Sequence, residues 1–447
     1  MIGIIVAASG LLGGTAGSSA APRAARAVST GPTTTQAAAV GLVGSTTTSP
    51  SAAGPTPTAV SGGSTSTTSS SSTTTTSVSP PGTSTTTSSS TSSTTTTTVG
   101  VAGNRAQVAA SAQVGAEVTF IESAQLADGA ITTYPGSGEV WPYLSNYAAM
   151  GLARAASMTG NASLAGEAWR EIGWYAANQG PGGVVTNATV SGGGTVPTGD
   201  VDSTDATAGT FLLAVRDAWL ASGDQGRLTA SAGAVAAAVS VIESTQDSDG
   251  LTWAKPSYHV KYLMDQAETY GGLEAAVTLA GALGDPALAT RAGSDAGRLA
   301  AGVAALWDPA TGAYDWAVHG DGIHQTTDWS LLYPDGLEQV WAVAYGLVSG
   351  PRAADLLARF TAGQGAWAEP TASARQEANG VVSSLAANYW PVGVWALATT
   401  GSAPAASAGE DSIRATAGST TDAWPYTPAI AGELIIGEQL LDGGPAE

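Results

Sequence analysis

The stretch MDQAETYGGLEAAVTLA, residues 264–280, decides the fold class. It begins with two carboxylates three residues apart, Asp265 and Glu268, and continues mostly in small apolar residues. A helix that is apolar on all sides is buried. The stretch therefore predicts a buried helix whose first turn carries acidic side chains.

Four other segments open in the same way, with carboxylates or aromatic residues followed by small apolar ones. The openings at residues 139, 202 and 265 are 63 residues apart, and such self-similarity is typical of a repeated helical hairpin. The segments are EVWPYLSNYAAMGLARA (139–155), VDSTDATAGTFLLAV (201–215), YPDGLEQVWAVAYGLV (333–348) and DAWPYTPAIAGELIIG (422–437).

The periodicity from residue 104 onward predicts an all-α domain over 104–442. Long apolar helices are expected to start near residues 141, 202, 263, 335, 380 and 424. Amphipathic helices are expected near 105–126, 162–178, 225–245, 286–305, 351–362 and 405–418. Six buried and six amphipathic helices fit two concentric rings, an (α/α)6 barrel. Its inner helices run parallel, small residues let them approach closely, and their electropositive N-termini converge on one mouth.

The first hundred residues differ sharply in composition from the rest. They contain no Asp, Glu or Trp, and their only charged side chains are Arg23 and Arg26. Residues 1–28 are predicted to be a signal peptide or an N-terminal anchor. Residues 29–103 are Ser/Thr-rich and cannot bury enough apolar surface to fold, so they predict a disordered stalk. We therefore expect a secreted or cell-surface protein. We also expect it to be a monomer.

The remaining composition excludes several classes of function. All 35 acidic residues lie beyond residue 100, which argues against nucleic acid and anionic membranes as partners. The chain has no cysteine, which excludes disulfides and thiolate chemistry. Its three histidines are dispersed, and zinc needs several nitrogen or sulfur ligands. The sequence predicts no metal and no cofactor.

Three pairs of carboxylates share a spacing of three residues. The pairs are Asp202 and Asp205, Asp265 and Glu268, and Asp335 and Glu338. On a helix this spacing places both carboxyls on one face, but it is also the spacing of a capping box. Cleavage of a glycosidic bond needs two carboxyls whose pKa values differ, and a rim of paired acids supplies candidates for both.

Aromatic residues accompany these acids in the loops that precede the buried helices. A flat ring beside a carboxylate suits a sugar, because the ring stacks on C–H groups and the acid bonds hydroxyls. The sequence therefore predicts a carbohydrate partner. The predicted substrate-binding residues are Glu139, Trp141, Tyr143, Trp253, Lys255, Tyr258, His259, Lys261, Tyr262, Trp329, Tyr333, Trp424 and Tyr426. Trp169, Trp219 and Trp341 are predicted to be core residues.

The two lysines of the chain, Lys255 and Lys261, flank the loop that enters the helix at 263. They are candidates to hold rim carboxylates ionised or to bind an acidic sugar. The structural alternative is ion pairing within the loop. His259, which lies between them, is expected to be structural or to bind a hydroxyl.

Four runs together resemble the six-hairpin glycosidase-like proteins of bacteria, the (α/α)6 barrels typified by glucoamylases and unsaturated-uronyl hydrolases. The runs are WPYLSNYAAMGLARA, DSTDATAGTFLL, DGLTWAKPSYHVKYLMDQAETYGGL and YPDGLEQVWA, and the resemblance spans 105–441 in order. The resemblance implies catalytic carboxyls at the mouth of the inner helices. The implied candidates are Asp202, Asp205, Asp265, Glu268 and Asp335.

The resemblance implies an extracellular glycoside hydrolase that cleaves a polysaccharide or an oligosaccharide. Asp265 or Glu268 is the expected proton donor, and Asp202 or Asp205 the expected base. Two alternatives stay open. One is a non-catalytic carbohydrate-binding surface protein on the same scaffold. The other is a polysaccharide lyase that uses Tyr258, His259 or Lys255 as its base.

Overall fold

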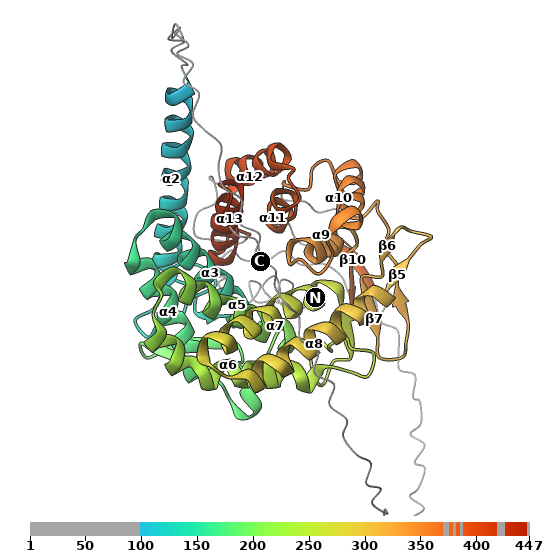
Figure 1. The fold of residues 1–447 in the computed structure, drawn as a ribbon, viewed down its shortest axis with the longest axis horizontal. Coiled ribbons are helices and arrows are strands. Elements are labelled where there is room, and N and C mark those ends of the chain that lie inside the picture. Colours follow the sequence, from blue (N-terminus) through green and yellow to red (C-terminus); the bar gives the residue numbers. More distant parts are fainter. Residues whose placement is uncertain (1–98, 370–374, 379–380, 385–387, 418–424, 445–447) are drawn as a thin grey trace, which may run out of the picture. The chain divides into compact units, whose positions relative to one another are not determined.

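The computed structural model describes residues 99–369, 375–378, 381–384, 388–417 and 425–444. The predicted signal and nearly all of the predicted stalk lie outside the described residues, as does Trp424. The described residues belong to one compact unit built almost wholly of helices (Figure 1).

Six helices form a closed inner ring, as the sequence predicts. Each contacts the next in the order α3, α5, α7, α9, α11, α13, and α13 returns to α3 (Figure 1). The inner helices are α3 (Pro142–Thr159), α5 (Thr204–Ser222), α7 (Leu263–Leu283), α9 (Leu337–Ala344), α11 (Val392–Thr399) and α13 (Pro428–Leu441). A π-turn, η2 (Leu332–Gly336), leads directly into α9.

Six further helices alternate with these along the chain and pack on the outside of the ring. They are α2 (Val99–Ala124), α4 (Ala162–Ala177), α6 (Gln225–Thr245), α8 (Pro286–Ala305), α10 (Gly350–Gly363) and α12 (Ala403–Ala417). α4, α6, α8, α10 and α12 each pack on the inner helix that precedes them, and α2 packs on α13 and α3. The predicted (α/α)6 barrel is confirmed.

The fifth inner helix begins later than predicted. A start near residue 380 is wrong, because a β-hairpin occupies this part of the chain and α11 starts at Val392. Val381 and Val382 favour this outcome, since β-branched side chains suit a strand. Pro391 at the N-cap suits the helix start, because a proline has no N–H to donate.

Glycines allow the inner helices to pack backbone against backbone. A Cβ atom on Gly272 of α7 would lie 2.4 Å from the Cα of Gly209 of α5. A Cβ on Gly151 of α3 would lie 2.3 Å from the Cα of Gly432 of α13. These contacts confirm the prediction that small residues bring the inner helices close together.

A repeated loop fastens two of the hairpins to the outer helix of the next one. The amide of Gln125, after α2, bonds the carbonyl oxygens of Gly129 and Glu167 at 3.0 Å each. The amide of Gln246, after α6, repeats this with the carbonyls of its own loop and of α8, at 2.8 and 3.0 Å. Gly129, at φ 105°, touches the backbone of α4, so no larger residue fits there.

Short antiparallel strands occupy the long loops between helices. Their sheets have the orders β1-β2-β3, β4-β7-β8, β5-β6 and β9-β10. The strands are β1 (Glu139–Val140), β2 (Ala188–Ser191), β3 (Gly194–Pro197), β4 (Val260–Tyr262), β5 (Trp307–Asp308), β6 (Ala313–Tyr314), β7 (Ala317–His319), β8 (His324–Gln325), β9 (Arg375–Ala378) and β10 (Val381–Ser384). A one-turn helix, η1 (Pro181–Gly183), lies between α4 and β2.

One helix of the described residues, α6, is long and apolar enough to cross a membrane by length and composition. Half of its most apolar window is buried in the protein. Because α6 packs against α5 and α7, its apolar residues serve the barrel.

Candidate active site

Side chains from four inner helices meet at the N-terminal end of the ring. Tyr143 of α3 bonds Glu268 of α7, and Ser203 before α5 bonds Asp265 of α7. The amide of Met264 donates to a carboxyl oxygen of Glu338 on α9. These four helices therefore run parallel, and their acidic residues gather, buried, at one end of the ring.

Buried partners also join the opposite, C-terminal ends of the inner helices. Arg154 near the end of α3 pairs with Asp217 near the end of α5, at 2.6 Å, and bonds Gln439 near the end of α13 at 2.9 Å. The Arg154 guanidinium holds down the pKa of Asp217 against the effect of burial. The two ends of the ring thus differ, with acids gathered at one end and a closed ion pair at the other.

Capping does not explain the paired acids. The N-cap residues of α5, α7 and α9 are Ser203, Tyr262 and Gly336, and none of them makes a side-chain capping bond. Glu338 instead reaches across to the backbone of α7, at 3.1 Å from the Met264 nitrogen. The acids therefore bond neighbouring helices more than their own first turns.

Asp205 and Asp265 share one hydroxyl. The Ser203 Oγ atom lies 2.7 Å from an Asp205 oxygen and 2.8 Å from an Asp265 oxygen. A hydroxyl has a single proton, so one of the two carboxyls must supply the proton for the second bond. Asp205 also accepts from Thr252 and from the Ala206 amide, so we assign the proton to Asp265. Burial, and then the Asp205 charge, raise the pKa of Asp265 well above its usual value.

Glu338 and Asp335 both accept hydrogen bonds from backbone amides. Burial raises the pKa of Glu338 well above its usual value, against the bond from Met264. Asp335 accepts from the amide of Asp328 at 2.7 Å and so anchors the loop before η2. Both carboxyls are fully buried.

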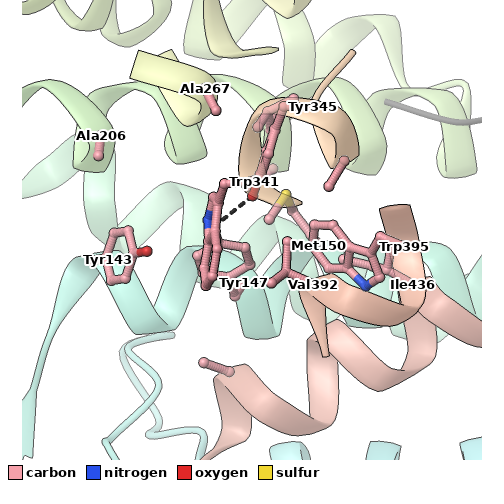
Figure 2. Packing of buried hydrophobic residues seen from close by; sticks show 14 of the residues in the cluster. Tyr143, Tyr147, Met150, Ala206, Ala267, Trp341, Tyr345, Val392, Trp395 and Ile436 are labelled. Atoms are coloured by element: carbon pink, nitrogen blue, oxygen red, sulfur yellow. Dashed lines mark hydrogen bonds between the residues drawn. The ribbon is translucent and has the colours of Figure 1, made fainter. Parts of the chain in front are cut away.

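Glu268 is a hub for three aromatic side chains. Its Oε1 atom accepts from the hydroxyls of Tyr143 at 2.7 Å and Tyr147 at 2.5 Å, and from the indole N–H of Trp341 at 2.9 Å. Tyr345, the residue after α9, bonds the Tyr147 hydroxyl at 2.6 Å, and Figure 2 shows these four rings gathered together. Burial raises the pKa of Glu268 to about 7, although the three bonds oppose the rise.

A pocket lies beside this hub. Its empty volume, which includes space open to solvent, is about 440 Å³. Five of its eleven described lining residues are aromatic, and one of the eleven carries a carboxyl, Glu433 on α13. The described lining residues are Tyr143, Leu144, Tyr147, Trp341, Asn388, Tyr389, Trp390, Thr427, Ala429, Ile430 and Glu433.

Glu433 and Glu268 differ in what stabilises their charges. Glu268 accepts three hydrogen bonds, and among the described residues the Glu433 carboxyl accepts none. Burial, and then the charge of Glu268, raise the pKa of Glu433 well above its usual value. When the pair carries a single proton, that proton is therefore on Glu433 and the negative charge is on Glu268.

The pocket contains two of the predicted site residues in different ways. Tyr143 lines it directly, and Glu268 reaches it through the side chains that it bonds. Asp202, Asp205, Asp265 and Asp335 are not among its lining residues. Asp202 is half-buried in the loop before α5.

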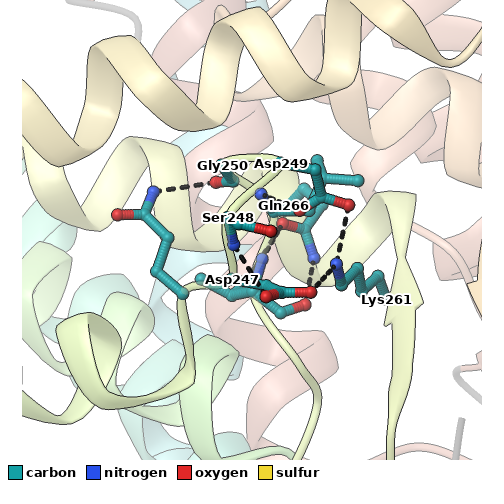
Figure 3. Close-up of polar contacts among 9 residues, drawn as sticks. Asp247, Ser248, Asp249, Gly250, Lys261 and Gln266 are labelled. Atoms are coloured by element: carbon teal, nitrogen blue, oxygen red, sulfur yellow. Dashed lines mark hydrogen bonds and ion pairs between the residues drawn. The ribbon is translucent and has the colours of Figure 1, made fainter. Parts of the chain in front are cut away.

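Lys261 has the structural partners that the sequence left as an alternative. Its ammonium lies 2.9 Å from Asp247 and 2.7 Å from Asp249 (Figure 3). It also lies 3.9 Å from the centre of the Trp253 ring. Only 2% of its side chain is exposed. It fastens the loop between α6 and α7 to β4, so its predicted contact with substrate is replaced by a role within the loop.

Of the other predicted binding residues, two are buried, one is exposed on a strand, and the rest lie in or near loops. Tyr262 and Tyr333 are buried, with Tyr333 stacked on Trp390 of the pocket at 4.8 Å and Tyr262 stacked on Trp316 at 6.3 Å. Glu139 is exposed on β1.

Six predicted binding residues lie in or near loops, and none of them is among the described residues that line the pocket. The His259 ring lies tilted against Trp253, Tyr258 bonds the Tyr262 hydroxyl, and Trp329 donates to the Thr311 carbonyl. The remaining members are Trp141, Lys255 and Tyr426.

No group of three or more potential metal ligands is close enough to hold an ion among the described residues.

Comparisons with known proteins find matches among solved structures. No protein-family model and no curated protein matches the sequence. Among solved structures, a glycosidase variant in complex with glucose is 16% identical, covers 76% of this chain and 99% of that chain, and gives a TM-score of 0.54. The GH63 mannosylglycerate hydrolase from Thermus thermophilus, in complex with glucose, is 14% identical over 72% of this chain and 98% of that chain, with a TM-score of 0.53.

The chain has the six-hairpin glycosidase-like fold. A GH78 family rhamnosidase of Bacillus sp. GL1 shares it, at 16% identity over 75% of this chain with a TM-score of 0.50, although this chain spans only 34% of that protein. The resemblance found in the sequence is confirmed at the level of the fold. At these identities the six-hairpin fold does not by itself assign an activity.

Sequence reasoning missed several residues of the pocket. Trp341 was predicted to be a core residue, and it is buried, but it also donates to Glu268 and lines the pocket. Glu433 was overlooked because it has no acidic partner three residues away. The signal was present, since a single carboxylate in the apolar run GELIIG must be buried.

Proposed function

We propose that the chain is an extracellular glycoside hydrolase whose active site is the aromatic pocket, with Glu433 as proton donor and Glu268 as the ionised partner. One observation carries the proposal. The Glu433 carboxyl lines the pocket with no hydrogen-bond donor among the described residues, while a second carboxyl, that of Glu268, accepts from two tyrosines and a tryptophan of the pocket wall. Glycoside hydrolysis needs one carboxyl in each state. The Ser/Thr-rich N-terminal segment supports an extracellular location.

The charge of the pocket favours an uncharged sugar. Its described lining has no lysine or arginine, and its only carboxyl is Glu433. A uronate would meet no cation there and would face the charge of Glu268 nearby. Trp341, Trp390 and the tyrosines offer faces on which the C–H side of a neutral ring can stack.

The test is a panel of neutral and acidic glycans and aryl glycosides, assayed for new reducing ends. We expect hydrolysis of neutral glycosides. Glu433→Gln and Glu268→Gln should each reduce kcat by roughly 10²–10⁴-fold at an unchanged melting temperature. Glu274→Gln, an exposed carboxyl on α7, is the control. Hydrolysis that survives in both site variants would exclude this pair.

Binding without turnover is the second candidate, and one observation favours it. Glu433 is the single carboxyl among the described residues that line the pocket, whereas hydrolysis needs two. Calorimetric binding of a neutral oligosaccharide, with no reducing ends released by the wild-type protein, would establish this function instead. An unsaturated product absorbing in the ultraviolet would indicate a lyase.

A further inference from the structure

The Glu268 hub contains two tyrosines that differ in their free hydrogen-bonding capacity. A tyrosine hydroxyl has one proton to donate and can also accept. Both Tyr143 and Tyr147 donate their hydroxyl hydrogen bond to Glu268, at 2.7 and 2.5 Å. The difference between them lies in what else their oxygen atoms contact.

The Tyr147 oxygen is already occupied. It lies 2.6 Å from the Tyr345 hydroxyl, and since Tyr147 donates to Glu268, Tyr345 must donate to Tyr147. Tyr147 is also deeper in the barrel, with 1% of its surface exposed. The Trp341 indole can donate but cannot accept.

The Tyr143 oxygen has acceptor capacity to spare. Its one hydrogen-bond partner among the described residues is Glu268, and the residue lines the pocket together with Glu433. A water molecule in the pocket can therefore donate to Tyr143. Tyr147 and Trp341 also line the pocket, but among the described contacts Tyr143 is the donor to Glu268 whose oxygen can still accept from a water there.

We propose that Tyr143 is a catalytic residue that relays a proton from the attacking water to Glu268. This inference rests on the proposed function. As the water oxygen bonds the anomeric carbon, its proton passes to the Tyr143 oxygen, and the Tyr143 proton passes to Oε1 of Glu268. Glu433 gives its proton to the departing glycosidic oxygen as that bond breaks. After product release, the proton on Glu268 returns through solvent to Glu433.

The relay must be concerted. Burial, and then the Glu268 charge, raise the pKa of Tyr143 well above its usual value, so a free tyrosinate would be costly. A hydroxyl that accepts one proton as it releases another never carries the full charge. Because water attacks directly, the relay requires inversion at the anomeric carbon.

The first experiment identifies the anomer released. A 4-nitrophenyl glycoside that the wild-type protein hydrolyses is followed by proton NMR before mutarotation. The inverted anomer is expected. A retained anomer would mean a covalent intermediate and would overturn the relay.

The second experiment compares three Tyr→Phe variants by pH–rate profile. In the wild-type protein, kcat/KM should rise with pH through about 7 as Glu268 ionises. Tyr143→Phe should lose this rise and reduce kcat by about 10²–10⁴-fold. Tyr147→Phe removes a donor to Glu268, which should move the rise to higher pH without abolishing it. Tyr345→Phe, which leaves all three donors to Glu268 in place, should keep the rise near the wild-type pH.

The third experiment adds azide, a nucleophile that has no proton to lose. Azide should restore turnover to Tyr143→Phe and Glu268→Gln and yield an inverted glycosyl azide. It should not rescue Glu433→Gln, which instead should recover with a 2,4-dinitrophenyl leaving group that needs no protonation. Melting temperatures within a few degrees of wild type would show that each variant is folded.

The outcomes separate this inference from the function on which it rests. If the wild-type protein cleaves no glycoside, the proposed function fails and the relay with it. If the wild-type protein is active but Tyr143→Phe matches its rate, or matches Tyr147→Phe in every profile, the relay alone is refuted. Failure of azide to rescue Tyr143→Phe refutes it as well.

Discussion

Two glycines on the same helix should respond in opposite ways to substitution by alanine. Gly272 and Gly281 both lie in α7. A Cβ on Gly272 would meet the Gly209 Cα at 2.4 Å and the Gly209 carbonyl oxygen at 2.5 Å, whereas a Cβ on Gly281 has nothing within 4 Å. Both substitutions place the same methyl group in the same helix, so the difference between them measures the effect of the close contact between α5 and α7.

The magnitudes follow from opposing terms. Carbon atoms pack at about 3.5–4.0 Å, so α5 and α7 must move apart by roughly 1 Å to admit the Gly272→Ala methyl group. Overpacking a core costs about 1–3 kcal/mol, and the upper end applies here because the atoms met are backbone in a closed ring. Alanine regains about 1 kcal/mol of helix propensity. We therefore expect a net loss of about 2 kcal/mol for Gly272→Ala and a gain of up to about 1 kcal/mol for Gly281→Ala.

The assay is urea denaturation followed by both circular dichroism and tryptophan fluorescence, whose agreement tests for a single transition. Gly272→Ala should also lower glycoside turnover. A Cβ on Gly209, on the other side of the same contact, would lie 2.7 Å from the Glu268 carbonyl oxygen, so separating the helices moves the hub. If Gly272→Ala is as stable as Gly281→Ala, the helices do not depend on this contact.

Three further predictions concern buried charge. Glu171 on α4 is fully buried, and burial raises its pKa from 4.5 to about 8. The contribution of Glu171 to the free energy of unfolding is therefore intact below pH 4.5. It is lost as the pH rises toward 8, by up to about 5 kcal/mol. In Glu171→Gln the urea midpoint should fall less steeply with pH than in the wild-type protein. An equally steep fall would contradict this prediction. Lys261→Met should cost about 1–2 kcal/mol and speed proteolysis of its loop while leaving turnover intact; lost turnover would restore its role in binding. Trp341→Phe removes a donor to Glu268, so the rise of kcat/KM should move above pH 7, and an unmoved rise would show that Glu268 does not control it.

The architecture was accessible from sequence because its cause is local. A helix apolar on every side must be enclosed, and six such helices at a regular spacing leave few arrangements other than a closed double ring. The prediction failed where tertiary context overrode the pattern. α11 has only eight residues, Val392–Thr399, and the chain ahead of it forms a hairpin instead of a first turn.

The candidate site was accessible only in part, because the partner of each acid depends on how its helix is rotated. Asp265 and Glu268 are one turn apart, as their spacing requires. Yet Asp265 bonds Ser203 before α5, while Glu268 bonds Tyr143 of α3 and Trp341 of α9. Spacing along one helix places two carboxyls on one face but does not say which neighbouring helices that face meets.

The same dependence on neighbours separates the pKa values of the two pocket acids. Glu268 and Glu433 are both buried carboxyls in apolar helices, and the sequence offers no reason to assign them different roles. The difference arises from donors on other hairpins, because α3 and α9 supply three to Glu268 and none of the described residues supplies one to Glu433. A hydrogen bond to a charged group contributes about 1.5–3 kcal/mol, equivalent to roughly one or two pKa units. Three such bonds are enough to decide which acid keeps the proton, so the assignment of proton donor and acceptor is a property of the closed ring.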